Sequence, residues 1–254
     1  MILCFDIGAS RIRAALALDD GLLALGEVAT PLHAFADFAA ALAPFLRDGL
    51  SSISISIAGV IDAQTGIAPV ANIPCLDGRP IADDLFESLG IPVQVLNDAD
   101  CFAMAEAHAG AGRGQHCVFG IILGSGVGGG IVLDGRILTG AGGFAGEWGH
   151  GPVIHDPAFQ CGCGQVGCLD TVGSARGIER LHRHLTGQDL TSVQIVQRWK
   201  AGEPTTVATW LDLVAGPLAM LVNTLGADVV PVGGGLGNEP LLVAALDDAV
   251  RARI

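Results

Sequence analysis

Three cysteines and a histidine form the most specific chemical pattern in the sequence. Cys161, Cys163 and Cys168 stand close together with glycines between them, and His150 precedes them. One imidazole and three thiolates are a common tetrahedral ligand set for structural zinc, and glycine permits the tight turns that bring neighbouring sulfurs onto one ion. The pattern therefore predicts a zinc site. His155 is the alternative nitrogen ligand, and redox chemistry of the Cys-x-Cys pair is the alternative function.

Two turns of small residues are candidates for binding phosphate. Residues 6–10 read Asp-Ile-Gly-Ala-Ser, and residues 124–130 contain five glycines. Backbone N–H groups in such turns can approach a phosphate, and Asp6 at the end of a strand could hold Mg²⁺. The first turn alone is equally consistent with an ordinary hairpin. Because no Lys follows and a strand takes the place of a helix, neither a P-loop nor a dinucleotide fingerprint is present. We predict that the two turns hold one nucleotide.

Asn97 and Asp98 stand where a strand ends and a helix begins. Phosphoryl transfer needs positioning, charge neutralisation and one carboxylate to accept the proton of the attacking hydroxyl. Asp98 is the candidate for this base. Asp is also a common helix N-cap, so the residues alone leave both interpretations open. Glu147, His150 and Asp170 flank the cysteine cluster and suit the recognition of sugar hydroxyls, although each alone is an ordinary surface residue.

The elements that must position these residues form a repeat. A strand, a small-residue turn, a strand, an Asp-Gly turn and a strand occur in this order twice, beginning at residues 2 and 117, and the first Asp-Gly turn lies at 19–21. Two copies predict two similar α/β lobes, 1–112 and 113–254, with a cleft between them and a linker at 110–114. From the apolar periodicity we expect strands at 2–5, 12–18, 22–28, 52–57, 93–96, 117–123, 129–133, 136–138 and 228–232, and helices at 34–46, 81–89, 98–108, 174–184, 205–225 (interrupted by Pro217) and 239–251.

Composition limits the function classes. Half of the 254 residues are hydrophobic and 15% are charged, which predicts a sizeable core. The net charge is −13 with scattered basic residues, so nucleic-acid and anionic-membrane binding are disfavoured. No apolar run approaches the roughly 18–20 residues that span a bilayer, and the first residues read as a strand rather than a signal peptide. One cysteine cluster among seven cysteines suggests a reducing compartment, so we expect a cytoplasmic protein.

Together these residues resemble the ROK family (repressors, open reading frames and sugar kinases) of the actin/hexokinase-like, ribonuclease H-like ATPase superfamily. The resemblance runs from Ile2 to about Leu236. It implies a two-lobed fold of duplicated βββαβαβα-type units and ATP- and Mg²⁺-dependent phosphorylation of a sugar, as well as a homodimer. The segments that carry it are residues 6–10, 97–106, 123–130, 145–150, 161–168 and 233–235.

The resemblance also implies roles for individual residues. Asp98 is the general base. His150 uses one ring nitrogen for the sugar and the other for zinc, so that the metal orients the ring. The remaining residues expected at the sugar are Asn97, Glu147, Asp170, Gly59 and Asn72; at ATP, they are Asp6, Gly8, Ser10, Gly124, Ser125, Gly126, Gly128, Gly233, Gly234 and Gly235; and at the structural zinc, they are His150, Cys161, Cys163 and Cys168.

Several positions depart from the family pattern. Ala9 and Ser10 stand where Gly and Thr are usual, Asp170 stands where Glu is usual, and Pro231 lies inside an expected strand. Family members usually add a strand and a helix beyond the position of Gly235, whereas this sequence stops at Ile254, so it is either a short variant or a truncated one.

Within the family, the segments around residues 97–106, 120–130 and 161–168 resemble bacterial members that phosphorylate N-acetyl-D-glucosamine, so the expected product is its 6-phosphate. Residues 147–150 also resemble members that phosphorylate fructose. A fructokinase or glucokinase activity is the alternative, as is a catalytically weak sugar-binding protein of kinase ancestry. Family repressors carry an N-terminal helix-turn-helix, and this sequence opens on a strand, so DNA binding is not expected.

Overall fold

The computed structural model describes residues 1–18, 21–62, 64–70 and 72–254. Asp19 and Asp20 of the expected first hairpin turn lie outside these residues. The chain forms two compact units, of which the first contains Met1–Cys101 and Thr139–Ala145 and the second contains Phe102–Leu138 and Gly146–Ile254. The expected division into lobes 1–112 and 113–254 stays a prediction.

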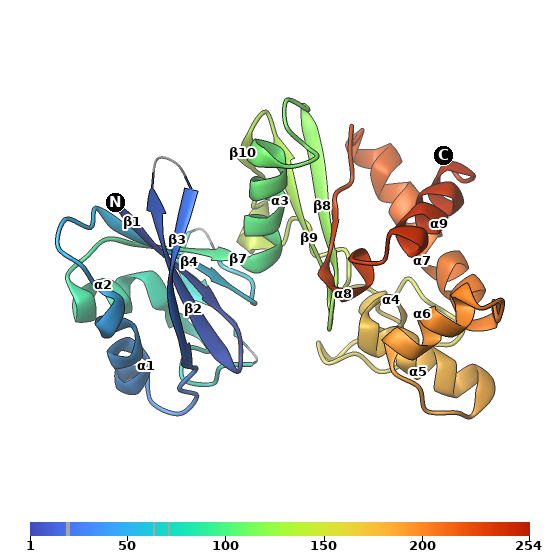
Figure 1. Cartoon of the computed structure of the whole chain (residues 1–254), viewed down its shortest axis with the longest axis horizontal. Helices are drawn as coiled ribbons and strands as arrows, with labels where there is room; N and C mark the ends of the chain where they lie inside the picture. The colour runs from blue at the N-terminus through green and yellow to red at the C-terminus, as the bar shows by residue number, and fades with distance from the viewer. Residues whose placement is uncertain (19–20, 63, 71) are drawn as a thin grey trace. The chain divides into compact units, whose positions relative to one another are not determined.

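The first unit is built on a five-stranded sheet in the order β3-β2-β1-β4-β7 (Figure 1). Strands β1, β2 and β3 are antiparallel neighbours, whereas β4 and β7 run parallel to β1. A separate two-stranded sheet joins β5 and β6. The bounds are β1 Ile2–Ile7, β2 Arg11–Leu18, β3 Gly21–Ala29, β4 Ser52–Ile57, β5 Ile67–Ala68, β6 Arg79–Pro80 and β7 Val93–Asn97.

Alternation of residue types decides which face of this sheet is covered. The Ser-Ile repeat of β4 places Ile53, Ile55 and Ile57 on one face, and all three are buried. Helices α1 (Phe35–Leu42, continued by the 3₁₀ turn Ala43–Phe45) and α2 (Ile81–Leu89) pack on that face in the same hydrophobic core. Figure 1 shows both helices on one side of the sheet.

The second unit has a four-stranded sheet in the order β10-β9-β8-β11. Strands β8, β9 and β10 are antiparallel neighbours and β11 is parallel to β8. Each sheet therefore combines an antiparallel meander with a parallel strand on the far side of its first strand, which agrees with the expected duplication. The bounds are β8 Cys117–Leu123, β9 Val127–Leu133, β10 Arg136–Ile137 and β11 Val232–Gly233.

Helices make up most of the rest of this unit. Helix α3 (Asp98–Ala109) starts in the first unit and continues in the second, where Ala103 packs close to Gly120 of β8. Helix α6 was not expected from the sequence. The remaining elements are α4 Asp170–Gly173, α5 Ala175–Thr186, α6 Ser192–Lys200, α7 Thr205–Leu225, α8 Gly234–Gly237, α9 Pro240–Arg251 and the 3₁₀ turn Ala141–Gly143.

Two expectations about prolines differ from the structure. Helix α7 is continuous through Pro217, so the expected interruption is wrong. The strand expected at 228–232 is reduced to β11, because Pro231 has no N–H to donate to a ladder. The segment still follows β8, since Val229 forms a bridge with Val118 and the N–H of Ile121 donates to the carbonyl of Pro231 at 2.9 Å.

Helix α7 is long and apolar enough to cross a membrane by length and composition, in contrast to the expectation that no stretch reaches this size. Polar residues such as Asp212 interrupt the apolar run without breaking the helix. Its Trp210, Val214 and Leu218 are buried, and the helix packs against α4, α5, α6 and α9. A buried core helix passes the same test, so this feature is weak evidence for a membrane span.

Candidate functional site

Hydrogen bonds hold the backbone of the turn between β1 and β2, in which Ala9 and Ser10 stand where the family usually has Gly and Thr. The N–H of Gly8 donates to the carbonyl of Arg11 at 2.9 Å. Thr30, the residue after β3, holds the turn, since its hydroxyl donates to the carbonyl of Gly8 at 2.7 Å and its N–H donates to that of Ser10 at 3.2 Å.

Asp6 is the second-last residue of β1 and has an exposed carboxylate. Its Oδ2 lies 3.2 Å from Nη1 of Arg13, and both side chains are more than half exposed. An ion pair in this setting contributes about 0–1 kcal/mol. Arg13 is therefore a weak competitor for a cation at Asp6.

Asn97 is the N-cap of helix α3. Its Oδ1 accepts hydrogen bonds from the N–H of Ala99 at 2.7 Å and of Asp100 at 3.2 Å, which is how a capping side chain satisfies the free donors of a first turn. Its Nδ2 donates to the carbonyl of Gly59 at 2.9 Å. Asp98 is therefore the first residue of the helix, and the capping role that the sequence left open for it belongs to its neighbour.

The carboxylate of Asp98 has a perturbed proton affinity. Partial removal from water raises the pKa of Asp98, and the negative charge of Asp6 raises it further, while the hydrogen bond from the Ala99 N–H lowers it. The residue still reaches solvent. Asp98 can thus contact a ligand and is a better proton acceptor than an ordinary aspartate.

Gly59 and Asn72 belong to loops of the first unit. Gly59 takes part in the site through its carbonyl, which binds Asn97. Asn72 is exposed in a turn. Contact of either residue with a sugar stays a prediction.

The second glycine-rich turn joins β8 to β9. The N–H of Gly124 donates to the carbonyl of Gly126 at 3.0 Å, and the carbonyl of Gly124 accepts from Ala175 at 2.7 Å. Ser125 and Gly126 are exposed at its tip. Gly234 has a positive φ of 87° and lies against this turn, because a Cβ there would stand 2.5 Å from the carbonyl carbon of Leu123. The structure therefore brings together two of the three segments predicted to bind ATP, 124–128 and 233–235.

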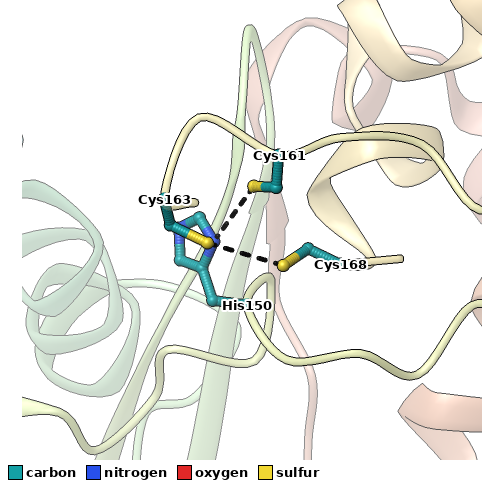
Figure 2. Close-up of side chains that lie close together, drawn as sticks. All are labelled: His150, Cys161, Cys163 and Cys168. Carbon is teal, nitrogen blue, oxygen red and sulfur yellow. Dashed lines mark hydrogen bonds between the residues drawn. The ribbon is translucent and has the colours of Figure 1, made fainter. Parts of the chain in front are cut away.

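The predicted zinc ligands converge on one point (Figure 2). One ligand atom from each of His150, Cys161, Cys163 and Cys168 lies within 4.8 Å of the others. The His150 Nδ1 is 3.7 Å from the Cys161 Sγ, and the Cys163 and Cys168 sulfurs are 3.6 Å apart. His150, and not His155, is the histidine of this cluster. One imidazole and three thiols at these separations fit a tetrahedral metal ion.

The surroundings of Cys163 favour ionisation of its thiol. The hydrogen bond from the Gln165 backbone N–H lowers the pKa of Cys163 to about 7, with His150 contributing. Burial raises the pKa of Cys161 to about 12. Three neighbouring thiols cannot ionise together without a cation, and a metal ion would supply that charge.

The two nitrogens of His150 face different groups. Nδ1 points to the cysteine cluster, whereas Nε2 lies 3.9 Å from Oε2 of Glu147. A metal at the cluster would fix the ring and leave Nε2 on the side of the Glu147 carboxylate. The family resemblance implies that the second ring nitrogen contacts the sugar, and this contact stays a prediction.

Asp170 makes a contact that sequence reasoning missed. Its Oδ1 accepts a hydrogen bond at 2.7 Å from the N–H of Val127, the first residue of β9. Its own N–H donates to the carbonyl of Gly149 at 2.8 Å. No local signal could reveal this partner, because Asp170 and Val127 are far apart in the chain.

Comparisons with known proteins identify the family of the chain. A sequence model of the ROK family matches residues 2–254. The chain is 34% identical to the N-acetylgalactosamine kinase AgaK of Shewanella sp. (strain ANA-3), over 98% of this chain and 86% of that protein. It is also 34% identical to the N-acetyl-D-glucosamine kinase of Pasteurella multocida, over 98% of this chain and 89% of that protein.

Solved structures give the same result. The ROK hexokinase from Thermus thermophilus matches with a TM-score of 0.86 and 30% identity, over 99% of this chain and 88% of that one. A ROK family glucokinase from Streptomyces griseus, in complex with glucose and AMPPNP, matches with a TM-score of 0.80 and 26% identity, over 99% and 89%.

Proposed function

The chain belongs to the ROK family, and on this premise we propose that it is an ATP-dependent sugar kinase that converts N-acetyl-D-glucosamine to its 6-phosphate. The observation that carries the proposal is the state of Asp98. Asn97 caps α3 in its place, and the carboxylate reaches solvent with a raised pKa. These are the properties required of a general base.

The described residues fit a nucleotide's phosphates. The N–H groups of Ser125 and Gly126 have no acceptor among the described residues, and both residues are exposed. Neighbouring free N–H groups in a turn favour an anion. ATP and Mg²⁺ supply the phosphoryl group and neutralise its charge. Asp6 would hold the cation, and the segment 233–235 would contact the adenosine.

Asp98 would accept the proton of the sugar hydroxyl as that oxygen attacks phosphorus. Its raised pKa increases its strength as an acceptor, provided that it remains ionised at the working pH. Asn97 supports this role by fixing the start of α3 and by holding the loop at Gly59. The remaining amide hydrogen of Asn97 would bind a sugar hydroxyl.

Glu147 and His150 would bind the sugar, with Nε2 of His150 as the contacting atom. A zinc ion held by His150, Cys161, Cys163 and Cys168 would be structural, because all four ligand positions come from the protein. The four ligand atoms lie close enough for this role. Contacts of Gly59 and Asn72 with the sugar remain part of the proposal, whereas the sugar contact that the resemblance implies for Asp170 is tested against a different role below.

A coupled assay for ADP formation against a sugar panel tests the proposal. We expect the highest kcat/KM with N-acetyl-D-glucosamine and lower values with glucose and fructose. N-acetyl-D-galactosamine is the second candidate, because one of the relatives at 34% identity is named for it. ADP formation that no sugar stimulates, together with tight sugar binding, would instead identify a sugar-binding protein of kinase ancestry.

We also propose a cytoplasmic homodimer that binds neither nucleic acid nor membranes. The kinase relatives support the location, the net charge of −13 disfavours nucleic acid and anionic membranes, and the dimer is carried over from the family resemblance. Light scattering of the purified chain measures the oligomeric state, and a monomer at working concentration would refute the dimer.

A further inference from the structure

Two side chains that flank the predicted zinc ligands in the sequence, Trp148 and Asp170, hold the phosphate turn, residues 124–128. The carboxylate of Asp170 accepts the N–H of Val127 at 2.7 Å. The indole Nε1 of Trp148 donates to the carbonyl of Gly128 at 2.8 Å. The two side chains thus bind the backbone N–H of Val127 and the backbone carbonyl of Gly128, on successive residues at the end of the turn.

The backbone of Asp170 and the ring of Trp148 are themselves held in place. The N–H of Asp170 donates to the carbonyl of Gly149 at 2.8 Å, and the hydroxyl of Ser174 donates to the carbonyl of Asp170 at 2.8 Å. Trp148 is buried, and its ring meets that of Phe119 edge-on with 5.9 Å between centroids. Neither hydrogen bond to the turn therefore depends on a residue that is free to move.

Two backbone N–H donors of the phosphate turn have no acceptor among the described residues. The N–H of Gly124 is taken by the carbonyl of Gly126, and that of Val127 is taken by Asp170. Among the described residues, the N–H groups of Ser125 and Gly126 have no acceptor. Two successive free donors favour an anion, and their direction depends on how the flanking residues are held.

We propose that Asp170 and Trp148 are positioning residues of the phosphate turn, which aim the free N–H groups of Ser125 and Gly126 and so set the affinity for the nucleotide. The inference rests on the proposed kinase function. It differs from the role that the family resemblance implies for Asp170, which is contact with the sugar. An ideal Cβ on Gly126 would lie 3.1 Å from Oδ1 of Asp170, so this oxygen lies against the turn.

The two roles of Asp170 make opposite predictions for binding. For Asp170→Ala we expect the dissociation constant of Mg·ADP to rise about tenfold, which is about 1.4 kcal/mol, because a charge-assisted bond to the turn is lost. The sugar dissociation constant should stay within about twofold of the wild type, since the backbone bonds of residue 170 to Gly149 and Ser174 remain. Calorimetry with Mg·ADP alone and with N-acetyl-D-glucosamine alone measures both constants.

Two more variants distinguish a lost hydrogen bond from general misfolding of the protein. Asp170→Asn keeps an oxygen acceptor for Val127 and should recover part of the nucleotide affinity. Trp148→Phe keeps the ring packing, loses the donor to Gly128, and should weaken Mg·ADP in the same way. Asp247→Ala is the matched control, because this exposed aspartate on α9 forms an ion pair only with Arg251 among the described residues. A change in sugar affinity with unchanged nucleotide affinity in the Asp170 variants would overturn the proposal.

Amide hydrogen exchange separates this inference from the kinase assignment. Exchange at Val127 should become faster in Asp170→Ala than in the wild type or in the Asp247→Ala control, with or without any ligand. Unchanged exchange at Val127 would refute the positioning role even in an active kinase. A wild-type chain that binds no nucleotide would refute the kinase assignment and, with it, the nucleotide part of the proposal.

Discussion

The change Asp98→Asn separates a catalytic base from a structural residue. In the wild type, Asn97 supplies the capping bonds of α3, at 2.7 and 3.2 Å, and the change leaves them in place. The Oδ1 of the new amide can still accept the N–H of Ala99, which donates to Asp98 at 2.9 Å. Asn is nearly isosteric with Asp, so a sugar hydroxyl can still be bound. Only the capacity to accept a proton is removed.

These contacts set the expected magnitudes. A negative charge in the first turn of a helix contributes about 0.3–1 kcal/mol, and here repulsion from Asp6 and partial loss of solvation offset it. The free energy of unfolding should therefore change by less than about 1 kcal/mol. Loss of general-base assistance lowers the rate by roughly 10²–10⁴-fold, which corresponds to about 3–5 kcal/mol of activation free energy.

The measurements are kcat, the sugar dissociation constant and the melting temperature of the same variant. We expect a large fall in kcat with little change in the other two. Asp83→Asn is the matched control, because Asp83 is an exposed acid in the first turn of α2. The reasoning is refuted if Asp98→Asn keeps a kcat within about threefold of the wild type while sugar still binds.

Three other outcomes follow from the structure. Metal analysis of chelator-washed protein should find one zinc per chain, and Cys161→Ser should lose the metal and unfold at lower temperature; a full complement of metal in this variant would contradict the ligand set. Activity should require Mg²⁺ or Mn²⁺, and Asp6→Asn should raise the KM for ATP. Because loss of the Asp6 charge lowers the pKa of Asp98, the acid side of the kcat–pH profile should also move to lower pH in this variant. An unmoved profile would count against the coupling between Asp6 and Asp98. Asn97→Ala should reduce the free energy of unfolding by about 1–2 kcal/mol, measured by chemical denaturation, whereas an unchanged value would mean that Asn97 does not cap α3.

Much of the fold could be predicted from local patterns. The Ser-Ile alternation of β4 fixes the strand and its buried face, and the bounds of β8, α2 and α7 agree with their apolar periodicity. Helix α6 was not predicted, because its sequence is mostly polar. A signal was present, since Thr191 and Gln194 form a capping box at its start.

The candidate site was predictable where neighbouring residues define it. The zinc ligands lie close together in the sequence, and glycine spacing indicates how they can meet. The capping by Asn97 and the bond from Val127 to Asp170 could not be predicted in the same way. Asn97 and Asp98 are equally good caps by residue type. The partner of Asp170 is known only once β9 and α4 have been brought together in space.

The segment Thr139–Ala145 belongs to the first unit, although residues 102–138 of the second unit precede it in the chain. Gly143 has a positive φ of 79°, and any side chain there would overlap the carbonyl of Ile61. During synthesis on the ribosome, the first unit therefore has to wait for residue 145, by which point β8, β9 and β10 have already been made. A fragment cut at residue 112 would lack this piece. The first unit is thus completed only after part of the second unit has been made.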